Sequence, residues 1–192
     1  MAQLAQPLTT ARLALRRPRL EDLDDLALIF GRDDVCRYLY WEPRTRDETL
    51  AVLTNRVERT ESLEDDNIIN VVIERREKSG VMGDFMLRWK EDEHHQGEIG
   101  GSLHPDFHGQ GYAVEIYEAL LNLAFETYHL HRVVGRCDGR NTASIRSLEK
   151  AGLHQEARLV ENEFVKGEWT DEVIMAIRRS DWEDRRRRSQ TR

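Results

Sequence analysis

The feature that most constrains the fold is a glycine-containing turn, His108-Gly109-Gln110-Gly111-Tyr112-Ala113. It lies between a strand predicted over 97–104, which Pro105 closes, and the clearest predicted helix, 111–128, whose apolar residues form one broad stripe. Glycine lets the backbone approach a ligand because no Cβ intervenes, and a helix N-terminus presents free N–H groups. The turn is therefore typical of a phosphate or pyrophosphate site, and an ordinary strand-to-helix turn is the alternative.

This turn matches neither common nucleotide-binding motif. Val114 stands where the dinucleotide fingerprint needs its third glycine, and no Gly-Lys-Ser/Thr follows as a P-loop requires. A second motif, Asn141-x-x-Ser144, opens the helix predicted over 142–151, so both side chains face the same way at a helix start. Alternatively, Asn141 is only an N-cap and Ser144 a polar residue of the first turn.

The remaining segments predict a mixed α/β sheet in a single domain. Period-two patterns and β-branched residues predict further strands over 11–17, 68–75, 81–90, 133–137, 155–165 and 168–178. Helical spacing predicts helices over 20–29 and from an Asp47 cap to Val57. We expect one domain over 1–182 and a basic, disordered tail over 183–192.

The composition and the distribution of charge limit which partners and cofactors the chain is expected to bind. The chain has 192 residues and a net charge of −7, but residues 178–192 hold seven arginines against three carboxylates, so the rest of the chain is strongly acidic. An acidic body argues against a nucleic-acid-binding domain, although the arginine tail could contact RNA or a ribosome. Two cysteines provide neither a disulfide framework nor a zinc site, which favours a cytoplasmic location. We expect no metal, no signal peptide and no membrane partner.

With both motifs in this order and spacing, the chain resembles the GNAT family of acetyltransferases, in particular the RimJ/RimL-type enzymes that acetylate protein N-termini. The family pattern Gln/Arg-x-x-Gly-x-Gly/Ala is matched at Gly111 and Ala113, and His108 departs from it. Other matching positions are Asn141, Ser144, Glu149, Lys150, Gly152, Leu153, Leu13-Ala14-Leu15-Arg16 and Glu98-Ile99-Gly100. The resemblance covers residues 8 to 182.

The resemblance implies a central, mostly antiparallel sheet in which the strands at 97–104 and 133–137 part to admit acetyl-CoA. The backbone of Gly101, Ser102 and Leu103 would pair with the pantetheine amides, and Asn141 would also bind the pantetheine arm. The N–H groups of His108, Gly109, Gln110, Gly111, Tyr112 and Ala113 would hold the pyrophosphate. The acceptor pocket would be lined by Tyr38, Tyr40 and Trp41, for which core packing is the alternative.

Amine acetylation needs a neutral amine, donors for the oxyanion and stabilisation of the leaving thiolate. The resemblance implies Glu98 as the base, directly or through water, and Ser144 as the hydrogen-bond donor to the sulfur. A solvent-facing strand glutamate is the alternative for Glu98. A free N–H near Gly101 could serve the oxyanion. Cys137 could instead act as an acyl-accepting nucleophile, but a small buried strand residue is its simpler role.

These observations predict direct acetyl transfer from acetyl-CoA to the α-amino group of a protein or peptide N-terminus. The alternatives are an acetyltransferase for a small amine (an aminoglycoside, a polyamine or an amino-acid analogue), a non-catalytic acyl-CoA-binding module and an RNA- or ribosome-associated protein. A homodimer stays open.

Overall fold

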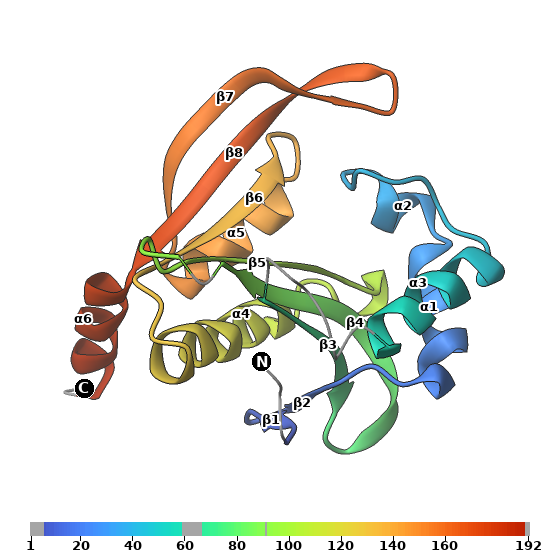
Figure 1. The fold of residues 1–192 in the computed structure, drawn as a ribbon, viewed down its shortest axis with the longest axis horizontal. Helices are drawn as coiled ribbons and strands as arrows, with labels where there is room; N and C mark the ends of the chain where they lie inside the picture. Colours follow the sequence, from blue (N-terminus) through green and yellow to red (C-terminus); the bar gives the residue numbers. More distant parts are fainter. Residues whose placement is uncertain (1–5, 59–66, 91, 191–192) are drawn as a thin grey trace.

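The computed structural model describes residues 6–58, 67–90 and 92–190 (Figure 1). The strands are β1 Leu8–Thr9, β2 Leu13–Arg16, β3 Asn67–Arg75, β4 Lys78–Trp89, β5 Gln96–Leu103, β6 Arg132–Asp138, β7 His154–Val165 and β8 Glu168–Arg178. The α-helices are α1 Leu23–Phe30, α2 Asp33–Cys36, α3 Arg46–Glu58, α4 Tyr112–Asn122, α5 Thr142–Ala151 and α6 Arg179–Gln190. A π-helical turn, Leu123–Thr127, continues α4.

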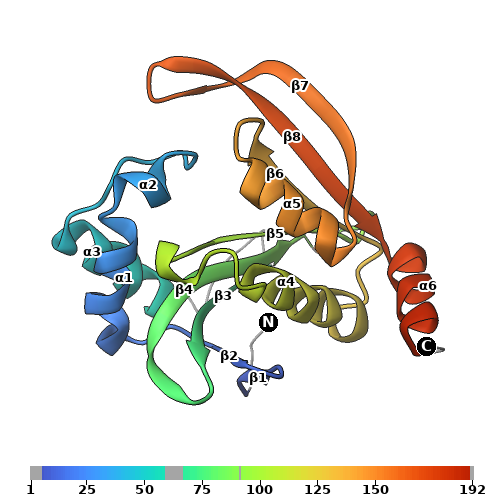
Figure 2. The ribbon, with the colours of Figure 1, turned by 180° about the vertical axis from the view of Figure 1, so that it is seen from behind.

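The described strands form one sheet in the order β1-β2-β3-β4-β5-β6-β8-β7. Neighbours are antiparallel except β5 and β6, which run parallel and pair only where residues 96–98 face residues 132–134. Beyond Glu98, β5 keeps β4 as its partner on one edge, and β6 diverges from the other edge (Figure 2). The prediction of a mixed α/β sheet with two parted strands is confirmed.

Helices cover both faces of the sheet, and β3 shows why. Ile69, Val71 and Ile73 point to one face and join the core beneath α4 and α5, whereas Val72 points to the other face and packs with α1 and α3. Successive side chains of a strand alternate between faces, so a β-branched run buried on both sides requires a helical layer on each. The opening between β5 and β6 therefore lies in a sheet that carries a helical layer on each face.

Two predicted boundaries are wrong for local reasons. The helix α3 begins at Arg46, not after an Asp47 cap, because Thr45 and Glu48 form a reciprocal capping pair: the Glu48 N–H donates to the Thr45 hydroxyl at 3.2 Å, and the Thr45 N–H donates to the Glu48 carboxylate at 2.8 Å. The strand predicted over 81–90 begins earlier, at Lys78. Arg75 pairs with Lys78, so the β3–β4 turn falls at 76–77 and Gly80 lies inside β4.

The arginine-rich C-terminus forms the helix α6 as far as residue 190, where a disordered tail was expected over 183–192; residues 191 and 192 lie outside the described ranges. Trp182 is buried and packs its ring 5.2 Å from that of Phe125. Arg185 donates to the Lys150 carbonyl at 2.6 Å, and Arg186 pairs with Glu126. The arginines that look solvated in the sequence thus meet acceptors on the helical layer.

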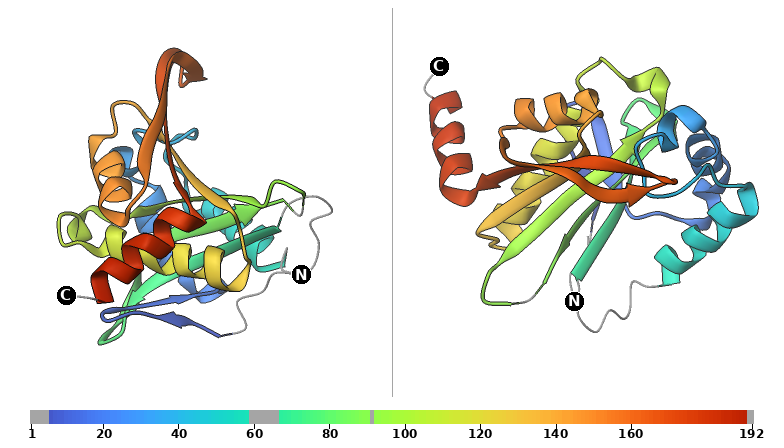
Figure 3. Two further views of the ribbon diagram at one scale, coloured as in Figure 1. Left: turned by 90° about the vertical axis from the view of Figure 1, so that its left-hand side faces the viewer. Right: turned by 90° about the horizontal axis from the view of Figure 1, so that it is seen from above.

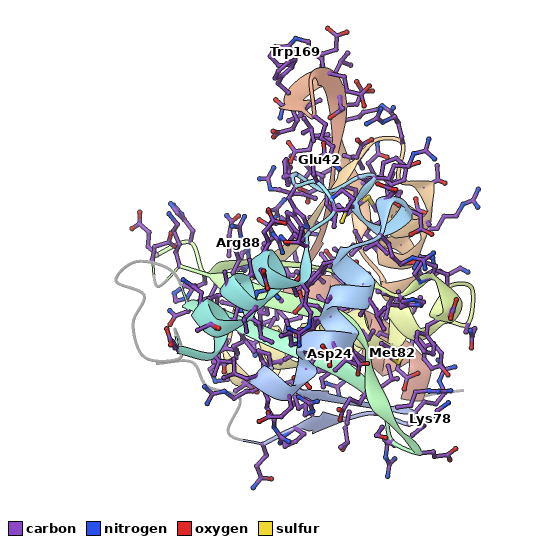
Figure 4. All side chains as sticks on the ribbon, turned by 90° about the vertical axis from the view of Figure 1, so that its right-hand side faces the viewer. Asp24, Glu42, Lys78, Met82, Arg88 and Trp169 are labelled. Carbon is purple, nitrogen blue, oxygen red and sulfur yellow. The ribbon has the colours of Figure 1, made fainter. Side chains whose placement is uncertain are left out.

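The β7–β8 hairpin projects from the sheet as a long arm, which Figure 3 shows most clearly. Near its tip, Phe164 and Trp169 are mostly exposed and contact each other, with ring centroids 5.2 Å apart. Its turn reaches back to the segment after α2, where the Lys166 ammonium donates to the Cys36 carbonyl at 2.7 Å and lies 3.5 Å from the Glu42 carboxylate. Figure 4 labels Trp169 at the tip, above Glu42. The arm therefore spans the space above the cleft.

Within the described ranges, no helix combines the length and apolar character needed to cross a membrane.

Candidate active site

The open edge of β5 forms the floor of the site. Gly101 pairs with Phe85 and Ser102 with Asp84 on the β4 side. A Cβ at position 101 would lie 2.4 Å from both the Asp84 carbonyl oxygen and the Phe85 ring, so the close approach of β4 requires glycine there. The backbone groups on the other edge of 101–103 face the opening left by β6, where an extended ligand can add to the sheet.

The glycine turn lies at the end of this strand. Gly109 and Gly111 both have left-handed backbone angles, with φ of 72° and 80°, and Gly111 is the N-cap of α4. A Cβ added at Gly109 would meet nothing within 4 Å, so this part of the loop is open. The helical hydrogen bonds of α4 begin with Glu115, which donates to the Gly111 carbonyl, and leave the preceding N–H groups available to an anion.

The side chains of His108, Gln110 and Arg12 make hydrogen bonds that support the backbone of this turn. The His108 ring Nε2 lies 3.0 Å from the Leu103 carbonyl, and the Gln110 amide donates to the Asp106 carbonyl at 2.8 Å. Arg12 donates to the Gln110 carbonyl at 3.0 Å and pairs with Glu115 at 2.7 Å. His108 and Gln110 thus support the loop through their side chains. The His108 N–H donates to the Pro105 carbonyl at 2.9 Å, so the N–H groups that remain for an anion begin with Gly109. Sequence reasoning did not predict this role of Arg12.

A cavity of about 400 Å³ extends from the turn to α5. It is lined by the glycine turn, by the end of β5 and by α5, where Arg146 and Lys150 add two exposed basic side chains. Positive charge beside an open helix N-terminus suits a ligand carrying several phosphates. The observed donors therefore fit the acetyl-CoA that the sequence resemblance implies.

The structure brings the second motif to the same place. The side-chain amide oxygen of Asn141, Oδ1, accepts from the Ser144 N–H at 3.1 Å, so Asn141 is the N-cap of α5, as the plainer interpretation of this residue required. Asn141 and Ser144 nevertheless both line the cavity of the glycine turn and the second cavity described below. Capping and ligand binding are compatible, because capping uses only the amide oxygen of Asn141.

Ser144 lies in a small buried cluster. Its hydroxyl oxygen is 3.2 Å from the Cys137 sulfur on β6, and Tyr117 on α4 lines the same two cavities as Ser144. Burial raises the pKa of the Cys137 thiol, which disfavours a thiolate nucleophile, and burial also raises the pKa of Tyr117. Sequence reasoning missed Tyr117, whose only signal was a hydroxyl within an apolar helical stripe.

A second cavity, of about 370 Å³, adjoins the first on the side of α2 and the hairpin. The aromatic residues predicted to line an acceptor pocket, Tyr38, Tyr40 and Trp41, all line it, and Tyr40 is 64% exposed. Ser144 and Tyr117 line both cavities, as do Gly101 and Ser102. The two cavities therefore meet at the open edge of β5.

Glu98 lines the second cavity and is held by two arginines. Arg88 donates to its carboxylate at 2.7 Å, and the Arg136 Nε lies 3.8 Å from the same oxygen. Arg136 also donates to Glu172 at 2.9 Å. The Glu98 side chain is 19% exposed, so water reaches the carboxylate. Among the described residues, no group of histidine, cysteine and carboxylate side chains is arranged to hold a metal ion.

Comparisons with known proteins agree with this geometry. The chain is 25% identical over 175 residues to the uncharacterized N-acetyltransferase YnaD of Bacillus subtilis (strain 168), covering 91% of this chain and 98% of that protein. It is 26% identical over 84 residues to the ribosomal protein uS5-alanine N-acetyltransferase of Escherichia coli (strain K12), covering 44% of this chain and 43% of that protein.

The fold is also that of a solved acetyltransferase. The structure of spermidine N-acetyltransferase from Vibrio cholerae in complex with CoA and spermine superposes with a TM-score of 0.74 at 22% identity, covering 90% of this chain and 99% of that chain. The model of the acetyltransferase (GNAT) domain matches residues 12–154. The chain belongs to the GNAT family and is an acetyl-CoA-dependent N-acetyltransferase.

Proposed function

We propose that this enzyme acetylates the α-amino group of a protein or peptide N-terminus, by direct attack on the acetyl group, with Glu98 as the base and Ser144 assisting the departing sulfur. The observation that carries the proposal is the meeting of two cavities at the open edge of β5. One cavity has the donors for a phosphorylated ligand, and the other is partly aromatic and opens between α2 and the hairpin arm. A reaction at their junction would use one ligand from each.

The residues of the first cavity would bind acetyl-CoA, which supplies the activated acetyl thioester. The N–H groups of residues 109–113 would hold the pyrophosphate, as free N–H groups at a helix start do for anions. The His108 N–H, which the sequence also predicted for this role, already donates to the Pro105 carbonyl. The open edge of 101–103 would pair with the pantetheine amides, and Asn141 would bind the same arm. The N–H near Gly101 would donate to the developing oxyanion.

The chemistry favours an α-amine. Only the neutral amine has a lone pair, and the unperturbed pKa is about 8 for an α-amino group against about 10.4 for lysine. An α-amine therefore loses its proton with modest help, which suits Glu98: its carboxylate is tied to Arg88 and reaches the acceptor through water. The resemblance to RimJ/RimL-type enzymes and the similarity to the uS5-alanine enzyme support this acceptor.

A small cationic amine is the second candidate, because the acceptor cavity is rich in carboxylates. Those lining it are Asp84, Glu98, Asp138, Glu163, Asp171 and Glu172, against Arg56, Arg88 and Arg136. A surplus of negative charge attracts a ligand with several ammonium groups. The likeness to the Vibrio cholerae enzyme, whose structure contains spermine, supports the same candidate.

The test is incubation with acetyl-CoA and matched panels of acceptors, followed by mass spectrometry. One panel pairs peptides with a free N-terminus with the same peptides blocked at the N-terminus but carrying a lysine. The other contains polyamines, aminoglycosides and amino-acid analogues. Acetylation confined to free N-termini supports the proposal, and acetylation confined to the second panel replaces it with the small-amine function. Tight binding of acetyl-CoA without transfer to any acceptor would indicate a binding module.

The cytoplasmic location, a homodimer and a ribosome contact through α6 stay predictions.

A further inference from the structure

A buried carboxylate of the hairpin arm lies near the proposed base and has no part in the mechanism described above. Glu172, on β8, lines the acceptor cavity and is 4% exposed. Its Oε1 accepts from the Arg136 guanidinium at 2.9 Å, and its Oε2 accepts from the Asn162 side-chain amide at 2.9 Å. A glutamate is seldom buried without such partners, because loss of water disfavours the charge. Both oxygens of Glu172 are engaged, and its bond to Arg136 fixes the direction of that guanidinium.

The arm carries an irregularity that brings Asn162 to this carboxylate. The register of β7 against β8 shifts over residues 159–163, and Glu161 within that stretch has a left-handed backbone with a φ of 48°. Bulges of this kind occur next to active sites, where they change the direction of a side chain. The irregular segment therefore supports Glu172 and, through it, Arg136.

Arg136 lies between two carboxylates at the point where β5 and β6 part. The two strands separate after Glu98 has paired with Val134, and Arg136 is the second residue of β6 beyond that pair. Its Nη1 is hydrogen-bonded to Glu172, whereas its Nε lies 3.8 Å from the Glu98 carboxylate, which is too far for a hydrogen bond. A guanidinium has five N–H donors and can form a close pair with either carboxylate. In this structure its closer partner is Glu172.

The position of Arg136 matters because a base has to accept a proton. An opposite charge in close contact favours the charged form of a carboxylate and so weakens it as a base, and the negative charge of Glu172 has the reverse effect. From β4, Arg88 already donates to Glu98 at 2.7 Å. The Tyr40 phenol in the same cavity stays protonated at neutral pH, because burial and the charges of neighbouring carboxylates raise its pKa. Arg136 is thus the neighbour of Glu98 whose distance from it depends on a third residue.

We propose that Glu172 is a positioning residue for acetyl transfer: it holds Arg136 away from Glu98 and so keeps the Glu98 carboxylate able to take the proton of the acceptor amine. The inference rests on the proposed function, because it requires Glu98 to be the base. Neither Glu172 nor Arg136 lines the cavity of the glycine turn. The effect of Glu172 should therefore appear in kcat and in its pH dependence, and not in the binding of acetyl-CoA.

A double-mutant cycle tests this role with acetyl-CoA and any acceptor that the panels identify. The variants are Glu172→Gln, Arg136→Gln and the two combined, and thermal melting follows the stability of each. Glu172→Gln keeps the shape of the side chain, removes its charge and frees Arg136 to close on Glu98. We expect kcat at neutral pH to fall about 3- to 10-fold, a small part of what a general base contributes, and the acidic limb of the pH–rate profile to move to lower pH. The KM for acetyl-CoA should stay close to that of the wild type.

The combined variant separates this role from a general loss of structure. Adding Arg136→Gln to Glu172→Gln should recover most of the lost kcat, because the cation that weakens Glu98 is then gone. A loss that Arg136→Gln fails to recover would overturn the inference. If Glu172→Gln alone did not fold, the combined variant would still decide: a kcat within about tenfold of the wild type would support the inference, and a larger loss would overturn it.

Glu168→Gln is the matched control. Glu168 is an exposed carboxylate of the same strand that pairs with Arg140 at 2.8 Å and lines neither cavity. This variant should keep the wild-type kcat and pH–rate profile. The same wild-type behaviour in folded Glu172→Gln would overturn the inference. Full activity of Glu98→Gln, or failure of the wild type to acetylate any amine, would instead refute the proposed function.

Discussion

At the scale of single residues, the site depends on how each polar group is oriented by its neighbours. Glu98 shares its carboxylate with Arg88 and Arg136, which fixes the side chain against the cavity wall. The Ser144 hydroxyl contacts the Cys137 sulfur at 3.2 Å. In both cases the group with the proposed chemical role is preorganised by residues from a different element, and preorganised groups need no rearrangement as the reaction proceeds.

Replacing Glu98 by glutamine keeps the shape of the side chain and removes its basicity. We expect kcat to fall about 10²- to 10⁴-fold, as is typical for loss of a general base, with little change in the affinity for acetyl-CoA. Steady-state kinetics with an accepted amine measures this. Glu149→Gln, at an exposed carboxylate of α5 outside both cavities, is the control. An unimpaired kcat in Glu98→Gln would mean that Glu98 is only a structural residue of β5 and not the base.

Cys137 separates direct transfer from a route through an acetylated enzyme. Its buried thiol has a raised pKa and contacts Ser144, so we expect Cys137→Ala to retain activity. Intact-mass analysis of the wild type mixed with acetyl-CoA alone should detect no added acetyl group. An acetyl thioester found on Cys137, together with ping-pong kinetics, would reverse the mechanism.

At the scale of elements, the order of strands and helices could be predicted because its signals are local. Apolar periodicity, Pro105 and the left-handed cap Gly152 mark their own elements. The Ser144 cluster could not be predicted, because Tyr117, Cys137 and Ser144 come from α4, β6 and α5 and meet only in the folded chain. The helix α6 was missed for a related reason: Trp182 packs on Phe125 and Arg186 pairs with Glu126, both on a distant segment.

The hairpin arm offers a test at this scale. Lys166 links its turn to the segment after α2 through the Cys36 carbonyl and Glu42, on one side of the acceptor cavity. We expect Lys166→Ala to raise the KM for the acceptor roughly 3- to 10-fold, or about 1 kcal/mol, the scale of one hydrogen bond. The KM for acetyl-CoA should not change.

Lys78→Ala is the control for that experiment, because Lys78 is an exposed lysine at the far end of β4 (Figure 4). Equal acceptor KM values in Lys166→Ala and the wild type would show that the arm does not shape the acceptor cavity.

At the scale of the whole molecule, the cleft lies between two halves of the sheet. One half consists of β1 to β5 and carries the open strand edge and the glycine turn that follows it. The other half consists of β6 and the β7–β8 arm, with α5 between β6 and β7 in the chain. They pair directly through only three residues of β5, and α4 and α5 bridge them across the core. A ligand added to the open edge would therefore tie together parts that the sheet itself joins weakly.

Acetyl-CoA should accordingly stabilise the whole fold. A ligand at about 100 times its Kd that binds only the native state adds about 2.7 kcal/mol, which for a chain of this size raises Tm by about 5–10 °C. Thermal melting with and without acetyl-CoA measures the shift. Gly109→Val is the matched variant. A β-branched residue is strained at a φ of 72°, so the substitution should displace the backbone of the loop and reduce the shift. If millimolar acetyl-CoA raised the Tm of neither protein, that result would contradict the placement of the cofactor in this cleft.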